Sequence, residues 1–253
     1  MTTKSLTSMA AAAEAASPSS SLLRRLVAVD TALSLRVHSL FLPVPRSLLK
    51  ALEVSGDGRF WFPVVLALLP LSSSVAFSLL LGLLLGSLLD LLLVGLLKHL
   101  VRRPRPVYNK GMSLAFALDH WSFPSGHSSR VFFIASFLHL SSASLRRWIR
   151  GGGGAGDGAE LVVRLVFLWS AATSASRVLL GRHFVFDVLA GACLGVVEAL
   201  ITFRSMRLLQ VLHMESETYE CNIVLDLILG MKFYFSHCRL HEELCRRIFG
   251  VVL

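Results

Sequence analysis

The chain has 253 residues, of which 54% are hydrophobic and only 16% are charged, and its mean hydropathy is +0.66. This composition excludes an ordinary soluble domain and indicates a protein that lies in a bilayer. The formal net charge of +9 favours anionic lipid head groups or an anionic substrate as partners, and nucleic acid is not expected because no basic stripe with interleaved aromatic residues is present.

The N-terminal segments are polar or amphipathic. Residues 1–20 are rich in Ala, Ser and Thr, and they are predicted to form a disordered tail because they contain too little hydrophobic bulk to fold alone. Residues 21–58 are predicted to form interfacial amphipathic helices, since charges such as Asp30 and His38 would be costly in the middle of a bilayer. The protein is expected in the endoplasmic reticulum membrane, and a plastid membrane is the alternative because the tail is Ser-rich and acid-poor like a transit peptide.

Apolar segments follow from residue 59 and predict membrane-spanning helices. Five spans are expected, at about 59–73, 75–97, 131–144, 161–180 and 184–203. The second span contains Gly82 and Gly86, and the fifth contains Gly191 and Gly195, at a spacing that permits close helix packing. Asp90 interrupts the second span, and it is expected either to act as a buried functional acid or to pair with a basic residue such as Arg164. We assign it no catalytic role.

The C-terminal part departs from this pattern. Residues 204–253 are predicted to form a divergent tail, in which residues 222–236 are a candidate sixth span although they contain Asp226 and Lys232. The four cysteines include no Cys-x-x-Cys pair, which favours reduced thiols over a disulfide or zinc framework. The expected fold class is therefore an all-α membrane bundle of five or six spans with its core at residues 59–203, and no oligomeric state follows from the sequence.

The first polar motif, KHLVRRPRP, contains Lys98 and Arg105. Pro104 and Pro106 should end the helix near Arg102 or 103 and leave Arg105 on an extended segment that can turn back toward Lys98. Taken alone, the motif is equally well explained as a basic cluster at the end of a membrane helix.

The second motif, FPSGHSSR, places Pro-Ser-Gly directly before an apolar helix. Helix N-termini present backbone N–H groups and a partial positive charge, so the amides around Ser125, Gly126 and His127 can hold a phosphate oxygen. His127 would then be in position to donate a proton. On its own, this stretch is more simply read as an ordinary capped helix start.

The third motif, SRVLLGRHFVFD, contains Arg177, His183 and Asp187. Arg177 can pair bidentately with phosphate, and Asp187 lies four residues after His183, one helical turn away on the same face. A carboxylate beside an imidazole fixes its tautomer and stabilises the imidazolium. The three motifs are expected to meet on one membrane face. Three separate structural explanations would have to place seven polar residues on that same face by chance, so we interpret the motifs as one site.

Together, Lys-x6-Arg-Pro, Pro-Ser-Gly-His and Ser-Arg-x5-His-x3-Asp resemble the type-2 phosphatidic acid phosphatase superfamily across residues 59–203. Within it, the chain is most similar to plant lipid phosphate phosphatases of the beta type. The resemblance implies phosphatidate hydrolysis in which His183 attacks phosphorus to form a phosphohistidine and Asp187 orients it. It also implies that His127 protonates the leaving alcohol and then activates water. The remaining motif residues would hold the phosphoryl oxygens: Lys98, Arg105, Ser125, Gly126 and Arg177.

The resemblance implies chemistry without a metal or other cofactor, and the carboxylates of the sequence form no cluster of the kind that Mg²⁺ sites use. One alternative within the family is a polyisoprenoid diphosphate phosphatase, because the motifs bind phosphate and not the lipid tail. Vanadium haloperoxidases resemble the same motifs but are expected to be soluble, which the apolar spans contradict. A non-catalytic lipid-binding protein is the third alternative.

The basic residues near the N-terminus favour a cytosolic active face, whereas Arg146, Arg147 and Arg150 favour the opposite face.

Overall fold

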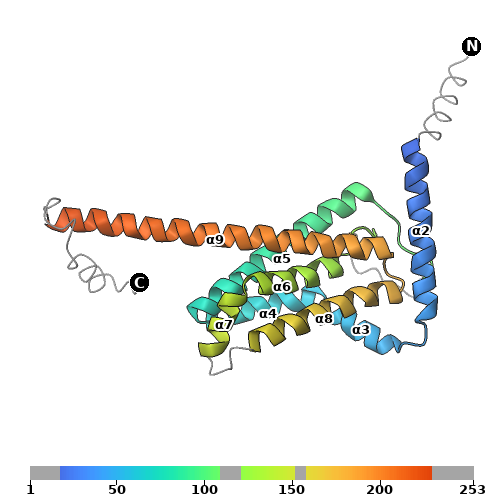
Figure 1. Ribbon diagram of the computed structural model, residues 1–253, viewed down its shortest axis with the longest axis horizontal. Coiled ribbons are helices and arrows are strands. Elements are labelled where there is room, and N and C mark those ends of the chain that lie inside the picture. The colour runs from blue at the N-terminus through green and yellow to red at the C-terminus, as the bar shows by residue number, and fades with distance from the viewer. Residues whose placement is uncertain (1–17, 109–120, 152–157, 230–253) are drawn as a thin grey trace, which may run out of the picture. The chain divides into compact units, whose positions relative to one another are not determined.

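The computed structural model describes residues 18–108, 121–151 and 158–229, and within these ranges it contains helices and no strand. The elements are α2 (Pro18–Leu40), α3 (Arg46–Ser55), α4 (Gly58–Leu68), the 3-10 turn η1 (Leu69–Leu71), α5 (Ser74–Val101), α6 (Gly126–Leu140), α7 (Ser142–Gly151), α8 (Gly158–Leu179) and α9 (Val185–Leu229) (Figure 1). The chain divides into two compact units, Met1–Phe203 and Arg204–Leu253. The packing and the site described below belong to the first unit.

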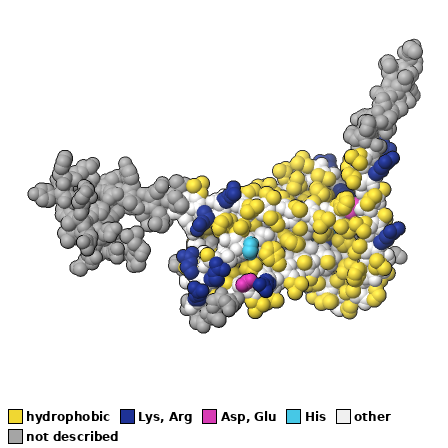
Figure 2. Space-filling model, in the orientation of Figure 1, with side chains coloured by type: hydrophobic (Ala, Val, Ile, Leu, Met, Phe, Trp, Pro, Cys, Tyr) yellow, Lys and Arg dark blue, Asp and Glu magenta, His cyan; other side chains and the backbone are white. Residues whose placement is uncertain are grey.

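Three helices are long and apolar enough to cross a membrane, namely Val75–Val101, Gly158–Leu179 and Val185–Gln210. They correspond to the second, fourth and fifth predicted spans. The first and third predicted spans are shorter helices, Gly58–Leu71 and the 15-residue α6. Hydrophobic side chains cover much of the face shown in Figure 2, with Lys and Arg gathered toward its two sides. An all-α membrane bundle is thus confirmed.

Some predicted segments fall on or beyond the limits of the described residues. Most of the predicted N-terminal tail lies outside them, although α2 already begins at Pro18. Residues 222–229 of the candidate sixth span belong to α9, and residues 230–236 lie outside the described part.

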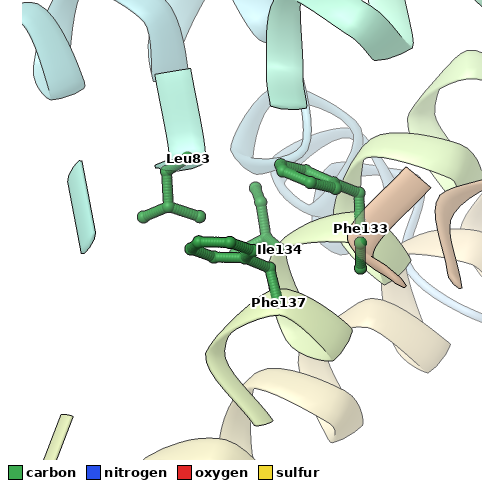
Figure 3. Packing of buried hydrophobic residues seen from close by; sticks show 5 residues of the cluster. Leu83, Phe133, Ile134 and Phe137 are labelled. Carbon is green, nitrogen blue, oxygen red and sulfur yellow. The ribbon is translucent and has the colours of Figure 1, made fainter. Parts of the chain in front are cut away.

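Helix α6 packs against α5 and α8 in the centre of the first unit. Its aromatic side chains form a core with Leu83 of α5, in which Phe133, Ile134 and Phe137 are almost fully buried (Figure 3). The rings of Phe133 and Phe137 stack with their centroids 5.9 Å apart. Large rigid side chains on α6 therefore require small residues on the helices that face it.

The glycines of the two predicted small-residue pairs meet this requirement. A Cβ atom at Gly82 or Gly86 of α5 would collide with the ring of Phe137 or Phe133. In α9, a Cβ atom at Gly191 or Gly195 would collide with backbone carbonyl oxygens of α6. The predicted close packing of the second and fifth spans is confirmed, and it brings the N-terminal ends of α6 and α9 side by side.

Asp90 is fully buried, and its partner is not the one that the sequence suggested. Its Oδ2 lies 3.1 Å from Nη2 of Arg130 on α6, whereas Arg164 forms an exposed ion pair with Glu160 one turn earlier on α8. The proposed pairing with Arg164 is wrong because α5 faces α6, and Arg164 points away from this contact. An uncompensated charge inside a span would be costly, and the ion pair with Arg130 offsets part of that cost.

Helix α2 buries polar residues and exposes apolar ones. Asp30 and Ser34 are fully buried, whereas large hydrophobic side chains such as Leu22, Leu26 and Val29 are 46 to 60% exposed. Asp30 faces the bundle, where an arginine and one backbone amide compensate its charge. The outward apolar surface suits contact with lipid.

Candidate active site

The end of α5 carries the first motif. The helix ends at Val101, and the next residue, Arg102, adopts a left-handed φ of 50° while its amide donates to the Lys98 carbonyl at 3.0 Å. The helix therefore ends where the two prolines predicted. Beyond this point Arg105 reaches across the site, where its Nη1 donates to the carbonyl of Arg182 at 3.3 Å. Lys98 is buried in the last turn of α5.

The start of α6 carries the second motif. Helix α6 begins at Gly126 with Ser125 as its N-cap residue. The amide of Ser125 is already used, because it donates to the backbone carbonyl of Asp187 at 2.9 Å. The following amides belong to the first helical turn, where intrahelical acceptors are lacking and the helix dipole is positive. Nε2 of His127 has no hydrogen-bond partner among the described residues.

His183 lies on the short connection between α8 and α9 and is 1% exposed. Its Nδ1 is 2.7 Å from the carbonyl oxygen of Ser122. Since a carbonyl can only accept, Nδ1 carries the proton and Nε2 keeps a lone pair in the neutral ring. Burial lowers the pKa of His183 to about 4, and the charges of Arg105 and Arg177 contribute, although the nearby Asp187 carboxylate acts in the opposite direction. The ring is neutral at pH 7.

Asp187 is close to His183 but has nearer partners. Its Oδ1 accepts from Arg103 Nη1 at 2.8 Å, its Oδ2 accepts from the Phe184 amide at 2.9 Å, and the same Oδ2 lies 3.9 Å from Nδ1 of His183. Asp187 lies in the first turn of α9, which begins at Val185, and its carboxylate caps the helix by accepting from the amide of Phe184, the residue before it. The direct acceptor of the imidazole proton is thus Ser122, and the carboxylate acts on the ring over a longer distance.

Arg177, in the last turn of α8, is held by an acid that the motifs do not contain. Its Nη1 lies 2.6 Å from Oε1 of Glu53 on α3, and Nε of Arg182 lies 3.3 Å from the same oxygen. Burial raises the pKa of Glu53, but Arg177 and Arg182 lower it by more, so the carboxyl is ionised at neutral pH. Glu53 therefore fixes two arginines at opposite ends of the segment that leads to His183.

The structure brings the eight predicted site residues to one end of the bundle. In Figure 1 the C-terminal ends of α5 and α8 and the N-terminal ends of α6 and α9 point toward α2. Lys98, Arg177 and His183 are near enough to act electrostatically on His127. The arrangement can bind a multiply charged anion beside two imidazoles. Within the described ranges, no group of three or more His, Cys, Asp or Glu residues could hold a metal ion.

Reasoning from the sequence missed several residues that support this site. They are Asp30, Glu53, Arg103 and Ser122. The signal for Asp30 and Glu53 was weak, because a single acid in an amphipathic helix normally faces water. Arg103 lies inside the first motif, but its spacing from Lys98 gave it no distinct role. Ser122 contributes a backbone carbonyl, which no sequence pattern can identify.

The chain is similar in sequence to known proteins. The sequence model of the PAP2 superfamily matches residues 74–210. The chain is 44% identical over 198 residues to a protein of Arabidopsis thaliana named probable lipid phosphate phosphatase beta, and the match covers 72% of this chain and 91% of that protein.

Two solved structures are similar. One is the crystal structure of the first transmembrane PAP2 type phosphatidylglycerolphosphate phosphatase from Bacillus subtilis, with 22% identity and a TM-score of 0.58, covering 78% of this chain and 90% of that one. The other is LpxE of Aquifex aeolicus, with 25% identity and a TM-score of 0.49, covering 68% and 93%. The Bacillus subtilis structure supports the fold. Because the family match covers more than half of the sequence and the Arabidopsis relative matches over nearly its whole length, the chain belongs to the PAP2 superfamily of membrane phosphatases.

Proposed function

We propose that the protein hydrolyses phosphatidate to diacylglycerol and inorganic phosphate through a phosphohistidine intermediate. A lipid substrate is supported by the name of the Arabidopsis relative, probable lipid phosphate phosphatase beta. It is also supported by the position of the candidate site at the ends of three helices that can cross a membrane. A site at the end of such helices can receive a phosphate head group while the acyl chains stay in the bilayer.

The observation that carries the proposal is the hydrogen bond from Nδ1 of His183 to the Ser122 carbonyl. It leaves a lone pair on Nε2 of a ring that is neutral at pH 7, and a neutral imidazole nitrogen is the form that can attack phosphorus. In the first step the Nε2–P bond forms and the bond between phosphorus and the glycerol oxygen breaks. The imidazolium that results is stabilised by Asp187, 3.9 Å away.

His127 is the proposed proton donor to the leaving glycerol oxygen. Without substrate, burial lowers the pKa of His127 well below its ordinary value, and the positive charges of Arg177, Arg130 and Lys98 contribute. A bound phosphate dianion would offset them and favour the imidazolium. In the second step the neutral His127 takes a proton from water, the hydroxyl oxygen attacks phosphorus, and the P–N bond breaks to release phosphate and restore His183.

Lys98, Arg105, Arg177 and the first-turn amides of α6 are proposed to bind the three phosphoryl oxygens. Charge builds on these oxygens in the transition state, where preorganised donors contribute most. Gly126 lies against α5, since a Cβ atom there would lie 3.2 Å from the Val94 side chain.

The test is a substrate panel on purified protein in detergent, comparing phosphatidate with farnesyl diphosphate and including His183→Ala. We expect phosphatidate to be preferred and the alanine variant to lose turnover by at least about 10³-fold, because it lacks the nucleophile. A large preference for the diphosphate would replace phosphatidate with an isoprenoid diphosphate as the substrate. Substantial turnover by His183→Ala would exclude the phosphohistidine.

A further inference from the structure

Helix α2 carries a polar stripe directed into the bundle. Asp30, Ser34 and His38 are spaced by four residues, so they lie on one face of the helix. Among the side chains of α2 that the structure describes, Asp30 and Ser34 are the buried ones. An inward polar face on a helix with an apolar outer surface is costly unless each polar group has a partner.

The partners of the stripe are the two ends of the connection that carries His183. At the end that follows His183, Ser34 Oγ accepts from the Val185 amide at 2.9 Å, and Asp30 Oδ1 accepts from the Phe186 amide at 3.0 Å. These amides belong to the first turn of α9, where intrahelical acceptors are lacking. At the end that precedes His183, Nδ1 of His38 donates to the carbonyl of Leu179, the last residue of α8, at 2.7 Å.

A second link runs through charge. Oδ2 of Asp30 lies 2.7 Å from Nη2 of Arg103, whose Nη1 lies 2.8 Å from Oδ1 of Asp187. Both carboxylates are fully buried and the Arg103 side chain is 15% exposed. The guanidinium also lies 4.0 Å over the ring of Phe184, the residue after His183. Arg103 therefore joins α2, the end of α5 and the start of α9 around the histidine.

We infer that α2 is a positioning element of the active site, and that Asp30 and Ser34 are positioning residues for His183. Helix α2 precedes residues 74–210, so this element lies outside the part matched by the superfamily model. The inference rests on the proposed function in that His183 is the attacking group. Asp30 and Ser34 set the direction of α9 and the place of Asp187, and through them the position of the imidazole relative to bound phosphate.

The test compares four single variants of the full chain on dioctanoyl phosphatidate in detergent. Asp30→Ala removes the charge and the acceptor for Phe186, Asp30→Asn keeps an acceptor, and Ser34→Ala removes the acceptor for Val185. Thr31→Ala is the matched control, because Thr31 is exposed on the same helix and donates only within it, to the Val27 carbonyl. Turnover is expressed per folded protein, measured by size-exclusion chromatography and thermal unfolding.

A displaced nucleophile slows the chemical step while phosphate binding by other residues persists. We expect kcat to fall by roughly 100-fold in Asp30→Ala, about 10-fold in Asp30→Asn and about 3-fold in Ser34→Ala, since a displacement near 1 Å can cost about 100-fold. KM and inhibition by inorganic phosphate should stay within about 2-fold of wild type, and Thr31→Ala should behave as wild type.

Two outcomes would overturn the inference. In the first, folded Asp30→Ala and Ser34→Ala keep the kcat of Thr31→Ala. In the second, KM rises while kcat is unchanged, which would assign α2 to substrate binding. If the wild-type enzyme prefers another member of the substrate panel, phosphatidate is the wrong substrate, and the same comparison on the preferred substrate still decides the role of α2.

Discussion

Glu53 and Arg177 form an ion pair in which the arginine is buried and the Glu53 side chain is 19% exposed. Arg177 is 3% exposed and its Nη1 is 2.6 Å from the carboxylate, which also contacts Arg182. Removing the carboxylate would be costly, because the remaining guanidinium would stay in a poorly solvated place without this partner. The position of Arg177, and hence of any phosphate that it binds, depends on an acid from a different helix.

We therefore predict that Glu53→Gln lowers kcat/KM for phosphatidate by about 10- to 100-fold, since small displacements of binding groups reduce turnover by such factors. The measurement is steady-state kinetics in detergent. Glu160→Gln is the matched control, because Glu160 forms an ion pair with Arg164 on the same helix as Arg177, but both side chains are more than two thirds exposed and such pairs contribute little. Equal activity of the two variants would show that Glu53 does not position Arg177.

At the scale of elements, the packing of α5 and α9 on α6 depends on glycine. Gly86 lies against the ring of Phe133, whereas nothing lies within 4 Å of a Cβ atom placed on Gly95 of the same helix. The two glycines therefore offer a comparison between a packed and an open position. Because α6 begins with the candidate phosphate-binding turn, its distance from α5 also fixes where that turn lies.

Gly86→Ala should lower the free energy of unfolding by about 1–3 kcal/mol, because the ring of Phe133 must move, even though alanine favours helix by about 1 kcal/mol. Gly95→Ala should be neutral or stabilising by about 0.5–1 kcal/mol. Thermal unfolding in detergent micelles gives both values relative to wild type. Similar effects of the two substitutions would contradict the close contact of α5 with α6.

At the scale of the whole molecule, positive charge predominates over negative charge. The chain has a net charge of +9, and the acids near the candidate site are each joined to an arginine: Asp30 and Asp187 to Arg103, and Glu53 to Arg177. Divalent cations such as Mg²⁺ are bound through carboxylate oxygens. The charge of the transition state would instead meet Lys98, Arg105 and Arg177.

We expect hydrolysis of phosphatidate by the purified protein to continue unchanged in excess EDTA, and added Mg²⁺ to give no activation. Initial rates with and without chelator, in the same detergent and at the same pH, provide the measurement. Loss of activity on chelation that Mg²⁺ restores would require a metal site and would contradict this account of charge stabilisation.

Much of the local structure could be predicted from the sequence because it depends on short-range properties. Long apolar segments predict membrane helices whatever their neighbours are, and the prolines after Lys98 end α5 where they were expected to end it. The Pro-Ser-Gly sequence marks the start of α6 for the same kind of reason. Motif spacing then identified the residues that the structure gathers at one end of the bundle, including His127, Arg177 and His183.

The tertiary structure alone decided which groups pair with one another. Asp90 pairs with Arg130, Asp187 accepts from Arg103, His183 donates to the Ser122 carbonyl, and α2 turns its polar face inward. Each of these contacts joins segments whose relative rotation is set by packing, such as that of glycines against aromatic rings. A sequence pattern records which side chains are polar, whereas their partners depend on long-range packing that local periodicity does not encode.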